Sequence, residues 1–198
     1  MCAQNDLKLG CVVMAAGSAT RFGGNKLASS LDGRSLIRRS LEAIPPSLFE
    51  QVVVVTQYPD IAVLAKEFRF TVIFNEHPES GISETIQLGL TQLRGCCGVM
   101  FQVSDQPFLR QETVARLAAL WRQNPDSIAA LSHGGQRGNP CIFPTRFFPE
   151  LMELSGDQGG SAVIRRHPEA LILLETEAVQ LADVDTRAAL EQLESLLP

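Results

Sequence analysis

Wholly apolar runs rich in β-branched residues alternate along this chain with stretches that have the period of amphipathic helices. Runs of this kind are typical of strands buried on both faces of a sheet. The order predicts an α/β fold with a largely parallel sheet and helices on both faces. The expected strands are residues 9–14, 51–56, 70–74, 99–103, 127–131, 141–143 and 171–174, and the expected helices are residues 35–43, 61–68, 84–93, 111–122 and 187–197.

The 198 residues predict a single domain, residues 1–198, because no internal repeat or low-complexity linker divides them. Residues 133–140 are polar and rich in glycine, so they form either a long loop or a β-excursion. In open α/β sheets, ligands bind outside the carboxyl ends of the strands. The loops after Met14, Phe74 and Val103 are therefore the places where a functional site is expected.

The loop after the first strand combines small residues with two cations. Gly17, Arg21 and Lys26 lie in it, and its small side chains let backbone N–H groups approach a phosphate closely. It is not a Walker A motif, because five residues separate Gly17 from Gly23 and Leu27 follows the lysine. It also lacks the G-x-G-x-x-G of a dinucleotide site. A phosphate-binding loop and a plain turn with surface cations both remain open at this point.

Carboxylates follow two of the apolar segments. Asp105 comes two residues after an expected strand, where it suits Mg²⁺ near a phosphate loop. It could instead cap the helix after Pro107. Asp183 and Asp185 have the period-two spacing that places both on one side of an extended chain. That pair could complete a metal site or cap the helix that begins at Arg187.

Three further loops carry polar and small residues. Gly81, Ser83 and Thr85 open an expected helix whose N-terminus faces the same sheet edge, where hydroxyl and N–H groups could contact a base or ribose. Residues 137–140 and 155–160 are rich in turn residues, and each of them is either structural or part of the site.

Composition and charge exclude several classes of protein. The formal net charge is −5 and no basic stripe is present, which argues against nucleic acid as a partner. No apolar run approaches the roughly 20 residues of a membrane span, and the N-terminus lacks the apolar core of a signal peptide. The five cysteines show no CxxC and the three histidines no ligand spacing, which indicates neither a disulfide framework nor a zinc site. We expect a cytoplasmic protein.

Taken together, these motifs resemble the nucleotidyltransferases of molybdenum cofactor maturation over about residues 9–190. The resemblance rests on Ala-Ala-Gly at 15–17, Gly-Ile-Ser-x-Thr at 81–85, Asp-Gln-Pro at 105–107, Gly-Asn-Pro at 138–140 and Asp-Val-Asp-Thr at 183–186. It implies a three-layer, Rossmann-like nucleotidyltransferase fold with a mostly parallel mixed sheet, similar to glycosyltransferase A. It also implies transfer of a nucleoside monophosphate to the terminal phosphate of molybdopterin, with release of pyrophosphate.

The resemblance also implies roles for individual residues. The Ala-Ala-Gly sequence points to CTP as the donor. The resemblance also implies Mg²⁺ (or Mn²⁺) as the metal and a molybdoenzyme or chaperone as the delivery partner. The implied catalytic residues are Arg21, Lys26 and Asp105; the nucleotide-binding residues are Ala15, Ala16, Gly17, Ser18, Arg21, Lys26, Gly81, Ser83 and Asp105; the acceptor-binding residues are Asn139, Pro140, Asp157 and Gln158; and the metal ligands are Asp105 and Asp185.

One departure concerns the acceptor. The family often has an arginine where this chain has Ser161, and Arg165 or Arg166, one turn later, are the candidates to replace it. Two alternatives stay open: a nucleotidyltransferase that uses GTP or another phosphorylated acceptor, such as a sugar or methylerythritol phosphate, and a non-catalytic protein that delivers the cofactor. An NAD(P)-dependent oxidoreductase is disfavoured by the missing fingerprint.

Overall fold

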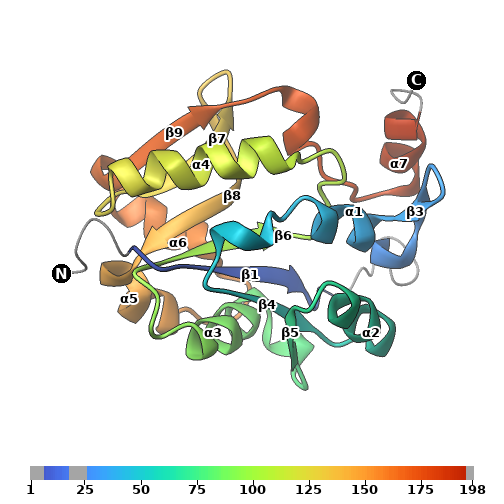
Figure 1. The fold of residues 1–198 in the computed structure, drawn as a ribbon, viewed down its shortest axis with the longest axis horizontal. Helices are drawn as coiled ribbons and strands as arrows, with labels where there is room; N and C mark the ends of the chain where they lie inside the picture. Colours follow the sequence, from blue (N-terminus) through green and yellow to red (C-terminus); the bar gives the residue numbers. More distant parts are fainter. Residues whose placement is uncertain (1–6, 18–25, 195–198) are drawn as a thin grey trace.

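In the computed structural model, which describes residues 7–17 and 26–194, seven strands form one mixed sheet (Figure 1). The order across the sheet is β5-β4-β1-β6-β8-β7-β9, and β8 runs antiparallel to both of its neighbours while the other pairs are parallel. The predicted α/β class and the mostly parallel sheet are confirmed. The strands are β1 (Leu9–Ala15), β4 (Gln51–Thr56), β5 (Thr71–Phe74), β6 (Gly98–Val103), β7 (Ile128–His133), β8 (Gln136–Pro144) and β9 (Leu171–Glu175).

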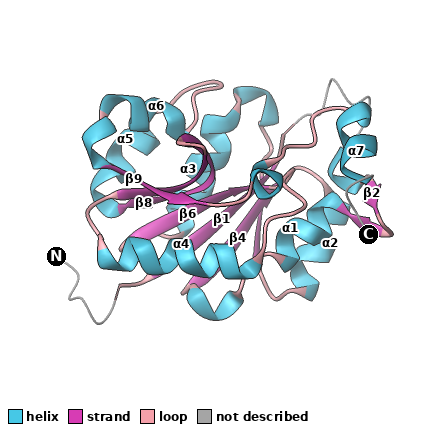
Figure 2. Cartoon of the chain, turned by 90° about the horizontal axis from the view of Figure 1, so that it is seen from above, coloured by secondary structure: helices cyan, strands magenta, loops and turns pink. Residues whose placement is uncertain are grey.

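Helices cover both faces of this sheet, as Figure 2 shows. One face packs against α1, α2 and α4, and the other against α3, α5 and α6. Alternate residues of the central strand serve the two cores: Cys11 and Val13 belong to the first, and Val12 to the second. The helices are α1 (Leu36–Glu42), α2 (Pro59–Glu67), α3 (Ile82–Gln92), α4 (Gln111–Gln123), α5 (Phe148–Met152), α6 (Gly160–Arg166) and α7 (Arg187–Glu194), and a small ribbon pairs β2 (Ser30–Leu31) with β3 (Arg34–Ser35).

Residues 133–140, for which a long loop and a β-excursion both remained open, form the turn and the first half of β8 in a β-hairpin of β7 and β8. Gly134 and Gly135 turn it, with φ values of 56° and 76° that suit glycine. The strand expected at residues 141–143 is the buried end of the longer β8, whose first residues are polar and only partly buried. Two short helices, α5 and α6, were not predicted, because five and seven residues are too few for a clear helical period.

No helix in the described part of the chain is both long enough and apolar enough to cross a membrane.

Candidate active site at the carboxyl edge of the sheet

Segments far apart in the sequence meet beyond the carboxyl ends of β1 and β6. The 3-10 helix η1 (Lys26–Ala28) brings Lys26 there, and Asp105 follows the end of β6 by two residues. The segment before α7 is tied to the same place, since the Val184 N–H donates to the Asp105 carbonyl at 2.9 Å. The Val184 side chain is completely buried. That anchor holds Asp185 at the site.

The Lys26 ammonium lies between two carboxylates. Its Nζ donates to Asp105 Oδ2 at 2.7 Å and to Asp185 Oδ1 at 3.1 Å. Burial acts to lower the pKa of Lys26, but the hydrogen bonds and charges of the two aspartates outweigh it and raise the pKa above its ordinary value. The lysine is therefore a cation at neutral pH. We expected Lys26 at the end of a phosphate loop near the metal ligands; in the structure it contacts both of these aspartates.

The donors present fit a divalent metal of the Mg²⁺ type. Asp105 and Asp185 place carboxylate oxygens around one cation, which is the hard oxygen chemistry that Mg²⁺ and Mn²⁺ prefer. Across residues 7–17 and 26–194, no group of three or more His, Cys, Asp or Glu residues could hold a metal. Further ligands would have to come from phosphate oxygens and water, as is usual for Mg²⁺ at nucleotide sites.

The two aspartates with period-two spacing have different partners. Asp183 Oδ1 accepts from Gln106 Nε2 at 2.9 Å, whereas Asp185 contacts Lys26. Burial, and then the nearby Asp105 charge, raise the pKa of Asp183. The alternative that Asp105 caps a helix is wrong, because α4 begins at Gln111, six residues later.

The end of β1 presents its backbone to the site in a fixed position. The side chains of Ala15 and Ala16 are buried, and Gly17 is exposed. The three carbonyls of these residues accept hydrogen bonds from the segment at the end of β4: from Thr56 Oγ1 at 3.0 Å, Gln57 Nε2 at 2.7 Å and Tyr58 Oη at 3.1 Å respectively. The predicted site residues Ser18 and Arg21 lie outside the described residues.

The start of α3 packs against the loop at residues 155–160. Gly81 has φ +87°, and a Cβ there would come within 2.4 Å of the Gly156 backbone. The Ser83 N–H donates to the Gly156 carbonyl at 3.1 Å, and the Ser83 side chain is buried. Gly81 and Ser83, which were expected to bind nucleotide, therefore lie against residues 155–160, the loop that contains two of the expected acceptor-binding residues.

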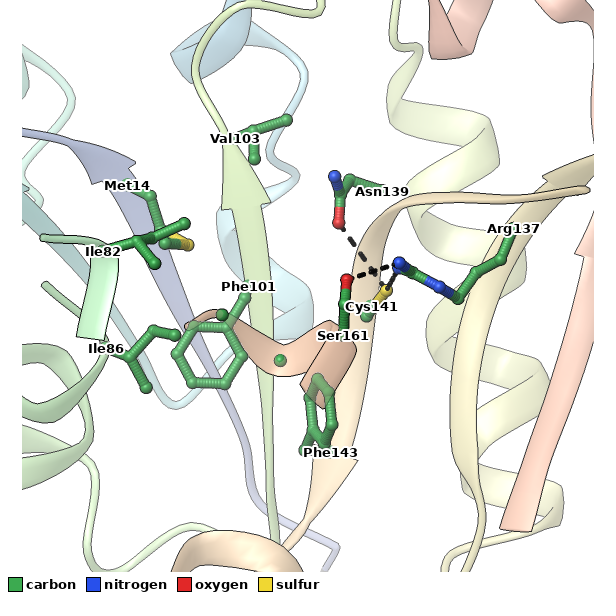
Figure 3. A pocket seen from close by; sticks show the side chains of 12 residues that line it. Met14, Ile82, Ile86, Phe101, Val103, Arg137, Asn139, Cys141, Phe143 and Ser161 are labelled. Carbon is green, nitrogen blue, oxygen red and sulfur yellow. Dashed lines mark hydrogen bonds between the residues drawn. The ribbon is translucent and has the colours of Figure 1, made fainter. Parts of the chain in front are cut away.

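Beside this edge lies a pocket of about 100 Å³, shown in Figure 3. Apolar side chains form one wall, two phenylalanine rings lie between the walls, and polar side chains form the opposite wall. It is lined by Met14, Ile82, Ile86, Phe101, Val103, Arg137, Asn139, Cys141, Phe143, Gly159, Gly160 and Ser161.

Of the four predicted acceptor residues, only Asn139 lines this pocket. Pro140 is buried in β8 after a cis peptide bond, and Asp157 and Gln158 are exposed on the loop beside α3. Arg137, next to the Gly-Asn-Pro motif at the start of the expected acceptor loop, was not among the four predicted acceptor residues but lines the pocket.

The arginines expected to replace the one missing at Ser161 do not lie in the pocket. Arg166 Nη2 pairs with Glu150 Oε2 at 3.3 Å, and Arg165 is exposed on α6. Arg137, from β8, contacts Ser161 instead, with Nη2 2.6 Å from the hydroxyl oxygen.

A lysine and two carboxylates lie at the carboxyl edge of a mixed sheet, where hydrogen bonds also hold the backbone of residues 15–17. This arrangement suits an enzyme that handles nucleoside triphosphates. The comparison with known families agrees: the chain belongs to the MobA-like NTP transferase domain family, whose model matches residues 11–171. It is thus an NTP-dependent nucleotidyltransferase of the MobA-like kind.

Named relatives support the family and the fold. The chain is 27% identical to the purine catabolism protein PucB of Bacillus subtilis over 188 residues, which cover 88% of this chain and 90% of PucB. It is 30% identical to a molybdenum cofactor guanylyltransferase of a Shewanella species, covering 74% of this chain and 72% of that one. A manganese complex of Rv0371C from Mycobacterium tuberculosis superposes with a TM-score of 0.77 at 21% identity, covering 96% of this chain and all of that one.

Proposed function

We propose that this protein transfers CMP from CTP to the terminal phosphate of molybdopterin and releases pyrophosphate, with Mg²⁺ as the metal. The observation that carries the proposal is the Lys26 ammonium between Asp105 and Asp185, at the sheet edge where the backbone of residues 15–17 is held. The relative from Shewanella, a molybdenum cofactor guanylyltransferase by name, supports the acceptor class.

Nucleotidyl transfer needs in-line positioning and neutralisation of the charge that grows on the leaving pyrophosphate. Lys26 would contact that pyrophosphate as a point charge. Asp105 and Asp185 would hold the metal, which supplies charge neutralisation when bound. The attacking group is the acceptor phosphate, and a phosphate monoester is already largely ionised near pH 7. The reaction therefore needs no general base from the protein.

Residues 15–17 support CTP as the donor, because their Ala-Ala-Gly sequence is the type that the resemblance associates with cytosine. The second candidate is GTP, which is favoured by the name of the Shewanella relative. A different phosphorylated acceptor with CTP is the other alternative within the same class.

The test is a pyrophosphate-release assay with CTP or GTP, with and without molybdopterin and Mg²⁺. We expect release that requires CTP, molybdopterin and metal together. Turnover with GTP and none with CTP would overturn the choice of base. Release with a sugar phosphate or methylerythritol phosphate and none with molybdopterin would overturn the acceptor.

A further inference from the structure

Arg137 is a partly buried cation whose described contacts are all neutral. Its Nη2 donates to Ser161 Oγ at 2.6 Å and its Nη1 to Cys141 Sγ at 3.3 Å. No carboxylate within residues 7–17 and 26–194 forms an ion pair with it. By contrast, Arg34, Arg38 and Arg110 pair with glutamates on the surface. A half-buried guanidinium without a counter-ion is costly unless a ligand supplies the anion.

Arg137 lines the same pocket as residues at the ends of the two strands that lead to the carboxylate site. In the antiparallel pair of β6 and β8, Phe101 is opposite Cys141. The pairing ends at this position, and Arg137, four residues before Cys141, lines the pocket together with Met14 and Val103 at the carboxyl ends of β1 and β6. The cation therefore belongs to the same sheet edge as the proposed metal ligands.

The pocket beside Arg137 suits the body of an acceptor rather than its phosphate. In Figure 3 Met14, Ile82 and Ile86 form the wall that faces the polar one, and the rings of Phe101 and Phe143 meet edge to face with centroids 5.9 Å apart. Apolar and aromatic walls with a few polar groups are typical of sites for a ring system.

We propose that Arg137, held in place by Ser161, binds the phosphate of the acceptor, while the apolar pocket receives the acceptor's ring. The inference rests on the proposed function for the existence of a phosphorylated acceptor, and it assigns the residues that recognise it. A phosphate approaching Asp105 and Asp185 meets like charge, and the Lys26 ammonium, the one cation that pairs with them among the described residues, is shared between both carboxylates. The planar fork of an arginine supplies the missing charge and fits phosphate oxygens in pairs.

The first test is Arg137→Gln, measured by steady-state kinetics with molybdopterin varied. We expect the KM for the acceptor to rise about 10- to 100-fold, because hydrogen bonds to a charged group are lost, while the KM for CTP changes less than about twofold. Arg165→Gln is the matched control: it removes the same charge from an exposed position on α6 and should leave both KM values unchanged. An acceptor KM that is unaffected by Arg137→Gln would overturn the inference.

Two further variants test the position of the guanidinium. Ser161→Ala removes the hydroxyl that holds it and should raise the acceptor KM about threefold without changing the KM for CTP. In the exchange Arg137→Ser with Ser161→Arg, the guanidinium enters from α6 instead of β8 and should recover part of the acceptor affinity lost in Arg137→Ser alone. Circular dichroism and thermal unfolding of each variant distinguish a folding defect from a binding defect. If the exchange variant is folded but recovers no acceptor affinity, the inference is overturned.

Failure of this inference can be told apart from failure of the proposed function. If the wild type uses another phosphorylated acceptor and Arg137→Gln raises the KM for that acceptor, the inference about Arg137 is supported. The assignment of molybdopterin as the acceptor is then overturned. If the wild type and Arg137→Gln use molybdopterin equally well, the proposed function is supported and the inference about Arg137 is overturned. If equilibrium dialysis shows that the wild type binds none of the phosphorylated acceptors, both are overturned.

Discussion

At the scale of single residues, Lys26 is the group on which the site depends most. Its ammonium offsets two carboxylates that would otherwise repel each other, and its raised pKa keeps it charged at neutral pH. Because the folded-state pKa is raised, the stability from these contacts is present below the ordinary lysine pKa and is lost as the pH rises through the higher value. The charge on which phosphate binding depends is therefore available throughout the physiological range.

We expect Lys26→Ala and Asp105→Ala each to lower kcat/KM by about 100-fold or more, because each removes a charge that acts on the triphosphate or its metal. The measurement is pyrophosphate release with saturating acceptor. Lys66→Ala, at an exposed lysine in the last turn of α2, is the control and should keep full activity. Near-normal turnover by either Lys26→Ala or Asp105→Ala would contradict the assignment of this site.

At the scale of elements, the hairpin of β7 and β8 is tied to the end of β9 by one carboxylate. Glu175 accepts from Ser132 Oγ at 2.8 Å and from the Gly134 N–H at 2.5 Å. The Ser132 hydrogen bond, then the one from Gly134, lower the pKa of Glu175 below its ordinary range. The hairpin turn is thereby held next to the polar start of β8, the strand that carries Arg137.

Removing this carboxylate should loosen the turn. We expect Glu175→Ala to reduce the hydrogen-exchange protection of the Gly134 amide about three- to tenfold. In the wild type the tie is present above the ordinary glutamate pKa of about 4.3 and is lost as the pH falls through the lowered value. Protection factors measured by NMR between pH 3 and 7 test both points, with Glu177→Ala, which removes a surface partner of Arg110, as the control. Equal protection in Glu175→Ala and wild type would contradict the assignment.

At the scale of the whole molecule, α4 packs closely against the sheet at Gly98. A Cβ on this residue would lie 2.3 Å from Trp121 Cζ2, and Trp121 is completely buried. Close-packed interiors do not absorb such an addition without moving side chains or backbone. The absence of a side chain at the start of β6 therefore decides how closely α4 approaches the sheet that carries the site.

Gly98→Ala should lower the free energy of unfolding by about 1–3 kcal/mol, the usual cost of overpacking a core. Gly95→Ala, three residues earlier, is a matched control, because a Cβ there has no atom within 4 Å, and it should change stability by less than about 0.5 kcal/mol. Urea unfolding followed by circular dichroism gives both values. Equal stability of the two variants would mean that the sheet and α4 are not packed as described.

The sequence by itself determined the class of fold and the candidate residues. Strand β4 has the bounds that its apolar run predicts, and most of the other expected strands and helices match to within a few residues, because periodicity is a local property of the chain. The position of Asp105 after a buried strand was enough to place it at the sheet edge. Short or polar elements such as α5, α6 and the first half of β8 carry no such signal.

Only the tertiary structure decided which of these residues work together. The contacts of Lys26 join residues 79 and 159 positions apart, and the contact between Arg137 and Ser161 spans 24 positions across the reversed strand β8. No local pattern encodes such distances, since they depend on the order and direction of strands in the sheet. The chemistry of the site was visible in the residue types, but the pairing of Lys26 with both aspartates and the entry of Arg137 into the pocket follow from the way the sheet is assembled.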